Sequence, residues 1–224
     1  MGEVEYFRRY FLEYLSEKVK RELGKEVIGV VGPLRTYLPF VIGMNEECLV
    51  DIEAIETYIS LARNVEELRA LADFLITHER KHKELSSRRP MLEHKMLSPV
   101  EIMWIANQCE DYYLDSFVVK PPAIEERRRL KALKAAISYY SKRRRKPSVH
   151  KLIGACELLA IYGATGDGSK LQRLLRRTVG KRAWPFVKRI VDLIKSIKTE
   201  EDLWKAEREI VNIVAELKSM GVVE

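Results

Sequence analysis

Apolar residues recur every three or four positions along most of the chain, and this spacing predicts helices. We expect helices over residues 3–24, 53–62, 64–85, 98–117, 123–142, 148–162, 168–178, 183–196 and 199–219. Two of them begin at capping signatures, since Asn64 and Ser98 each precede a glutamate by three positions. Only EVIGVVG (26–32), TYLPFVIG (36–43) and CLVDI (48–52) look like strands.

The strand-like runs predict a small antiparallel sheet, because turn-like residues 44–47 separate the second run from the third. Pro39 cannot donate a ladder hydrogen bond, so we expect its strand to lie at an edge, where a peptide could add as a further strand. The predicted fold class is α+β: this sheet, a helix that carries residues 78–82, and an all-helical C-terminal region. The sequence Lys-Pro-Pro at 120–122 divides the chain into regions 1–120 and 121–224.

Charge is distributed unevenly between these two regions. Residues 1–120 hold 16 lysines and arginines against 21 acids, a net charge of −5, and residues 121–224 hold 24 against 12, a net charge of +12. No run of eighteen apolar residues occurs, so we expect no membrane span and a cytoplasmic location. A charged fraction of 33% with few asparagines and glutamines is typical of a thermophile protein.

The stretch T-H-E-R-K-H-K-E (77–84) contains the one pattern with specific chemistry, His78-Glu79-x-x-His82. Two histidines four residues apart on a helix lie side by side, at the separation that one zinc ion requires. Glu79 lies one residue further round the helix, where it could take a proton from a metal-activated water. The histidines continue an apolar stripe of the same helix, formed by Leu68, Leu71 and Leu75. We therefore expect them to face inward; the alternative is a chance match on an exposed, charged helix.

A catalytic zinc ion needs a third protein ligand and an open fourth position. The candidates are His94, Glu110 and Asp111. Glu110 falls on the inward stripe of the helix 98–117, whereas Asp111 falls on a more polar face. Because a buried acid needs a partner, Glu110 is the preferred ligand, and the alternative is that it pairs with an arginine.

Strands followed by a helix with H-E-R-K-H and a second helix with an acid resemble the gluzincin class of zinc metallopeptidases. The segment N-Q-C-E-D-Y-Y-L-D (107–115) also resembles the N-x-x-E-D-x-x-I-E segment of metallopeptidase-like domains found beside von Willebrand factor A modules. The resemblance implies zinc, with His78, His82 and Glu110 as ligands and Glu79 as general base. It also implies that Asp111 or Asp115 orients a ligand histidine by accepting a hydrogen bond from the ring nitrogen that does not bind the metal. The chain lacks both the H-x-x-G-x-x-H extension of metzincins and the N-E-x-x-S-D signature of thermolysin.

The function predicted on these grounds is zinc-dependent hydrolysis of peptide bonds in a peptide or protein substrate. The alternative is a nucleic-acid-associated or regulatory protein that carries a zincin-like site, because the C-terminal half is strongly basic. Its basic clusters include residues 127–129 and 142–146 and a scattered set between 173 and 189. A third possibility is a structural helical protein with a chance motif.

Overall fold

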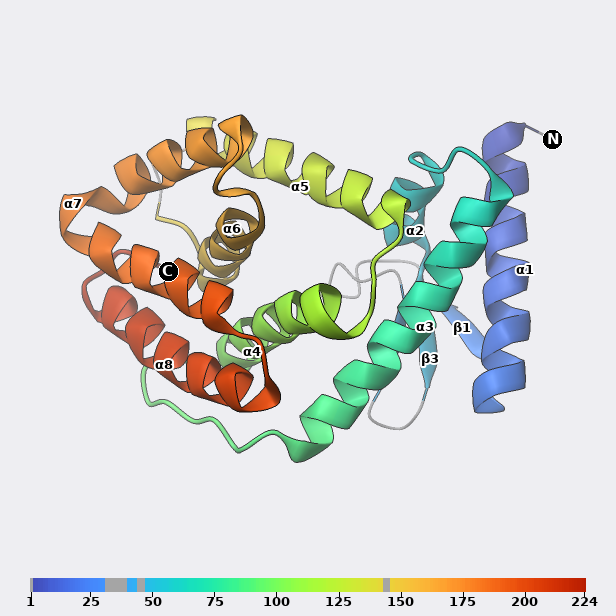
Figure 1. Ribbon diagram of the computed structural model, residues 1–224, viewed down its shortest axis with the longest axis horizontal. Helices are drawn as coiled ribbons and strands as arrows, with labels where there is room; N and C mark the ends of the chain where they lie inside the picture. The colour runs from blue at the N-terminus through green and yellow to red at the C-terminus, as the bar shows by residue number, and fades with distance from the viewer. Residues whose placement is uncertain (1, 31–39, 44–46, 143–145) are drawn as a thin grey trace. The chain divides into compact units, whose positions relative to one another are not determined.

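The computed structural model describes residues 2–30, 40–43, 47–142 and 146–224, and most of these residues are helical (Figure 1). The elements are α1 (Glu3–Leu23), β1 (Val27–Val30), β2 (Phe40–Ile42), β3 (Cys48–Asp51), α2 (Ile52–Ile59), α3 (Val65–Arg88), α4 (Pro99–Tyr113), the π-helical turn η1 (Leu114–Val118), α5 (Ala123–Lys142), α6 (Val149–Tyr162), α7 (Gly166–Ser196) and α8 (Glu200–Ser219). The chain packs as two units, the first with residues 1–87 and 119–129, the second with residues 88–118 and 130–224.

The sheet of the first unit is mixed, and the prediction of an antiparallel sheet is wrong in this respect. β3 lies in the centre; β2 pairs with it antiparallel and β1 pairs with it parallel. β3 fits a central strand because its apolar residues Cys48 and Val50 are buried. Strands next to each other in sequence usually pair, and that rule fails for β1 because β3 lies between it and β2. Residues 40–42 are at an edge as expected, and Pro39 lies outside the described residues.

The helices of the first unit bury their apolar stripes in one core with the sheet. That core includes Phe11 and Leu15 of α1, Val50 of β3, and Leu71 and Leu75 of α3. The side chain of Asn64 accepts a hydrogen bond from the backbone N–H of Glu67 at 3.0 Å, so the predicted capping residue fixes where α3 begins. The apolar pattern of α3 therefore sets which face of the helix points inward at residues 78–82.

A buried carboxylate ties the start of α5 to the first unit. Glu125 is 2% exposed, and one of its oxygens accepts a hydrogen bond from the Tyr58 hydroxyl of α2 at 2.7 Å. Arg128 and Arg129, three and four residues on, donate to the same carboxylate at distances from 2.6 to 3.2 Å. Charge-assisted hydrogen bonds of this kind offset the cost of burying the acid.

In the described residues of the second unit all regular secondary structure is helical. α4 packs against α6 and α8, and α7 packs against the same two helices. α4 begins at the capping box of Ser98 and Glu101, as the sequence predicts. α7 bends at Gly180, and Figure 1 shows its two segments meeting at an angle. Gly180 has φ +84°, a left-handed conformation that side chains disfavour, so glycine separates the helices predicted at 168–178 and 183–196.

Packing divides the chain differently from the boundary expected at residue 120, since both units are built from two separate segments. The fold class α+β and the helical C-terminal region agree with the observed elements. Among the described residues, no helix combines the length and apolar character that crossing a bilayer requires. The basic cluster at 142–146 lies mostly outside the described residues, because 143–145 belong to the gaps.

Candidate metal site

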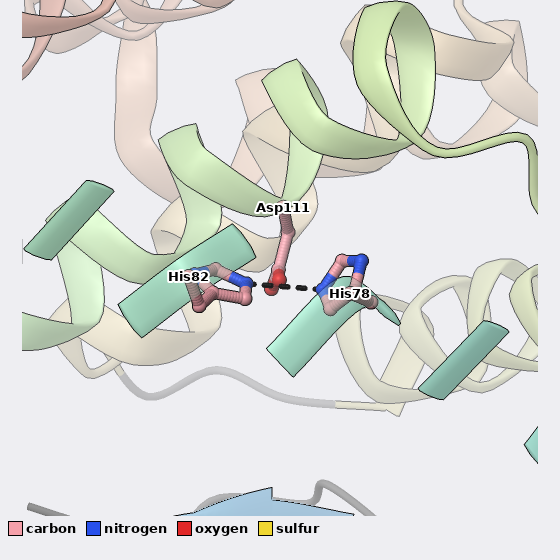
Figure 2. A group of neighbouring side chains, drawn as sticks. All are labelled: His78, His82 and Asp111. Carbon is pink, nitrogen blue, oxygen red and sulfur yellow. Dashed lines mark hydrogen bonds between the residues drawn. The ribbon is translucent and has the colours of Figure 1, made fainter. Parts of the chain in front are cut away.

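The two histidines of the H-E-x-x-H pattern lie next to each other on α3, as their spacing predicts. His78 is 4% exposed and His82 is half-buried, so the face that carries them points inward. Their Nε2 atoms are 3.0 Å apart, with one nitrogen donating and the other accepting a hydrogen bond. Figure 2 shows this contact as a dashed line between the two rings. Two nitrogens that bind one tetrahedral zinc ion at roughly 2.0–2.1 Å lie about 3.3 Å apart, which is close to the observed spacing.

The ring of Phe74 restricts the first histidine of the pair. Phe74 lies one helical turn before His78 on α3, and the centroids of the two rings are 5.2 Å apart. The rings of His78 and His82 meet edge to face, with centroids 4.6 Å apart. Because a packed helix holds both imidazoles, the pair needs little rearrangement to accept a cation between its two nitrogens.

One group of side chains in the described part of the chain could hold a metal ion, and it consists of His78, His82 and Asp111 (Figure 2). Its donor set, two imidazoles and one carboxylate, is of the kind found at catalytic zinc sites with an open position. Asp111 is carried by α4, in the second unit, so the first unit alone fixes only the geometry of the histidine pair.

Glu79 follows the first histidine directly and is 6% exposed. Its position one residue round the helix from His78 is the one that the sequence pattern predicts for a general base. The charged look of this stretch comes from Arg80 and Lys83, which are exposed on other faces of α3. The inward orientation of the motif is thus confirmed, and the catalytic role of Glu79 stays a prediction.

Glu110 is fully buried, as its place on the inward stripe of α4 predicts. Arg89 donates a hydrogen bond from its Nη2 to one oxygen of this carboxylate. This is the arginine pairing that the sequence leaves open as the alternative to a metal-ligand role. No local pattern points to Arg89, which lies 21 residues earlier in the chain. The ligand role of Glu110 remains a prediction, whereas Asp111 belongs to the group that could hold a metal.

Arg89 also faces a second buried acid, which the sequence analysis missed. Glu207 of α8 is fully buried, and the Nε of Arg89 lies 3.7 Å from one of its oxygens. Burial raises the pKa of Glu207 to about 8; Arg89 opposes this rise, and Glu110 adds to it. Arg89 thus lies within ion-pair distance of two buried acids, Glu110 and Glu207.

His94, the remaining candidate ligand, is in the segment between α3 and α4. Its Nδ1 accepts a hydrogen bond from the backbone N–H of Met96 at 3.2 Å. Among the described residues it belongs to no group that could hold a metal ion.

A pocket of about 380 Å³ lies in the first unit, at the opposite face of α3. The residues of α3 that line it are Arg80, Lys83, Glu84 and Ser87. These positions are three, one and three residues apart, so they share one face of α3. That face is rotated by about half a turn about the helix axis from the face of the two histidines. The pocket is therefore separate from the histidine pair.

Comparison with family models, curated proteins and solved structures finds no match to this chain.

Proposed function

We propose that this protein is a zinc-dependent metallopeptidase whose metal is held by His78, His82 and a carboxylate from α4. The observation that carries the proposal is the pair of imidazole nitrogens 3.0 Å apart on the inward face of α3. A buried glutamate stands between the two histidines in the H-E-x-x-H order. This combination of spacing, burial and residue types is what a metallopeptidase site requires.

Asp111 is our choice for the third ligand. It belongs with the two histidines to the group that could hold a metal, and three protein ligands would leave the fourth position of a catalytic zinc ion for water or substrate. Glu110 is committed to Arg89, and recruiting it would break a buried ion pair. Asp111 thus replaces Glu110 as ligand in the proposal.

A zinc ion bound here would polarise the scissile carbonyl and acidify a water molecule. The role left to Glu79 is to take a proton from that water and to deliver it to the leaving amine. Glu79 is suited to this role by its place in the H-E-x-x-H order and by its burial beside His78. The edge strand β2 would hold an extended peptide by backbone hydrogen bonds.

The first test of this proposal is the metal content of the purified protein. We expect about one zinc ion per chain, and we expect the variant His78→Ala, His82→Ala to have none. His94→Ala, a histidine outside the group, is the matched control and should retain the metal. A wild-type protein that binds no zinc on titration would overturn the site.

Activity needs a separate test, because a zinc site alone does not make an enzyme. Glu79→Gln should keep the zinc ion and lower the cleavage of a casein or mixed-peptide substrate by at least about a hundredfold, in line with the loss of a general base. The exposed neighbour Glu84→Gln is the control and should cleave at the wild-type rate. Equal cleavage by the Glu79→Gln variant would exclude Glu79 as the base.

A further inference from the structure

The surface of α7 carries far more positive than negative charge. Nine lysines and arginines lie on this helix against two acids, Asp167 and Asp192, and all nine are exposed. They are Lys170, Arg173, Arg176, Arg177, Lys181, Arg182, Lys188, Arg189 and Lys195. A helix of 31 residues with a surplus of seven positive charges produces a strong positive potential on its exposed side.

These cations fall into stripes on both sides of the bend at Gly180. In the first segment Lys170, Arg173 and Arg177 follow steps of three and four, which places them on one face. In the second segment Lys181, Lys188 and Lys195 repeat every seven residues, again on one face. The apolar residues between them are buried against the rest of the second unit, so the charged faces are the ones left to solvent.

Few of the charges on α7 are neutralised within the protein. Arg189 pairs with Glu209 of α8, its Nη2 lying 2.6 Å from a carboxylate oxygen. In the part of the chain that the structure describes, the other eight have no acid within ion-pair distance. Like charges spaced one turn apart repel each other and destabilise a helix, so this arrangement has a cost that folding alone does not explain.

The bend adds a second cost of the same kind. Lys181 and Arg182 are the first two residues of the segment that follows Gly180. The N-terminal end of a helix carries partial positive charge and favours acids, so two cations there oppose the helix dipole. These two cations therefore destabilise the helix itself, whereas they would stabilise an anion bound next to this helix end.

We propose that the exposed face of α7 binds the phosphate backbone of nucleic acid. The occupant is identified by charge complementarity: a row of cations along an extended, bent helix matches a linear polyanion with closely and regularly spaced charges. Contacts to phosphates carry no sequence information, so this binding is non-specific in sequence and depends strongly on salt. This surface lies in the second unit and does not depend on the histidine pair of the first.

The test measures binding of the full-length chain to a fluorescently labelled 20-base-pair DNA duplex between 50 and 300 mM salt. We expect the affinity to fall steeply with salt. The variant Arg173→Ala, Lys181→Ala, Lys188→Ala should bind at least about tenfold more weakly at 100 mM salt. Its slope of log affinity against log salt should be smaller by about two to three, since each phosphate contact contributes about 0.9.

The matched control removes the same charges elsewhere in the second unit. Lys198→Ala, Lys205→Ala, Arg208→Ala lies at exposed positions of the α8 region, next to Glu200, Glu201 and Asp202, and should bind with the wild-type salt slope. His78→Ala, His82→Ala should also bind normally, which separates this proposal from the metal site. Equal losses in the two triple variants would overturn the proposal, as would binding to anionic lipid vesicles with no binding to DNA or RNA.

Discussion

Glu125 of the first unit and Glu207 of the second are both buried acids, but neighbouring cations compensate them to different degrees. In the first unit Glu125 accepts hydrogen bonds from Tyr58, Arg128 and Arg129, and the exposed Arg9 of α1 pairs with Glu13. In the second unit Glu207 is buried with the guanidinium of Arg89 at 3.7 Å, and α7 exposes nine cations against two acids. Compensated charges stabilise a fold, whereas uncompensated ones have a free-energy cost and are expected where a partner or a proton binds.

The largest effect expected from this comparison is at Glu125. Glu125→Ala removes the acceptor of three donors and leaves Arg129 buried beside the hydroxyl of Tyr58. We expect it to lower the free energy of unfolding by about 3–5 kcal/mol, as in other buried ion pairs that lose one partner. Urea denaturation followed by tryptophan fluorescence and circular dichroism measures this loss. The exposed neighbour Glu126→Ala is the control, and a loss below about 1 kcal/mol at Glu125 would contradict the comparison.

The next largest effect is on zinc affinity, and it distinguishes Asp111 from the neighbouring Glu110, which pairs with Arg89. Asp111→Ala should weaken zinc binding by at least about a hundredfold, because losing a ligand exceeds the 10- to 100-fold effect of losing an outer partner. Glu110→Gln keeps the shape of the side chain and should change zinc affinity by less than about tenfold. Competition titration with a chelating dye gives both values. The reverse order of the two variants would return Glu110 to the ligand role that the sequence predicts.

A smaller effect, dependent on pH, is expected at Glu207. Its pKa is about 8 in the folded chain and 4.5 ordinarily, so the folded state holds this proton more tightly than the unfolded state. The resulting stability is fully present below about pH 4.5 and is lost as the pH rises through 8. Glu207→Gln should therefore raise the unfolding temperature by a few degrees at pH 9 and leave it nearly unchanged at pH 5.

Calorimetry of Glu207→Gln at the two pH values tests this sign. The exposed acid Glu216→Gln on the same helix is the control and should show no pH-dependent gain. If the two variants behave alike at pH 9, Arg89 compensates Glu207 as fully as the arginines of the first unit compensate Glu125.

The smallest effects are on the surface, and here the two units should differ in sign. Arg9→Ala removes a cation that lies 2.7 Å from Glu13 and should lower the unfolding temperature by about 1 °C or less. Lys181→Ala removes a cation from the start of a helical segment with no acid beside it, and should raise it by a similar amount. Differential scanning fluorimetry at low salt resolves the two, and at high salt the difference should disappear through screening.

Most of the helical structure was predictable because local signals agreed with each other. The capping residues Asn64 and Ser98, the glycine at 180 and the spacing of apolar residues each act over one or two helical turns, so the sequence contains the whole signal. The inward orientation of His78 was predictable for the same reason, since it continues a stripe of leucines on its own helix.

The sheet topology was not predictable from such signals. Hydrophobic patterns identify strands but do not say which strands pair. In the structure β3 lies between β1 and β2, and it pairs with β1 in parallel. The pairing of Arg89 with Glu110 could not be predicted for the same reason. Arg89 and Glu110 are on different segments, and no repeat or spacing in the sequence connects them.

The sequence by itself determined the positions of the helices, the side-by-side placement of His78 and His82, and the excess of positive charge in the second half of the chain, because each depends on spacing or composition alone. Tertiary structure decided which strand lies at the centre of the sheet and that Glu110 pairs with Arg89. It also decided that Glu207 is buried beside the same arginine. These outcomes depend on contacts between segments far apart in the chain, where burial and electrostatic pairing are set by the packed fold and not by neighbours in sequence.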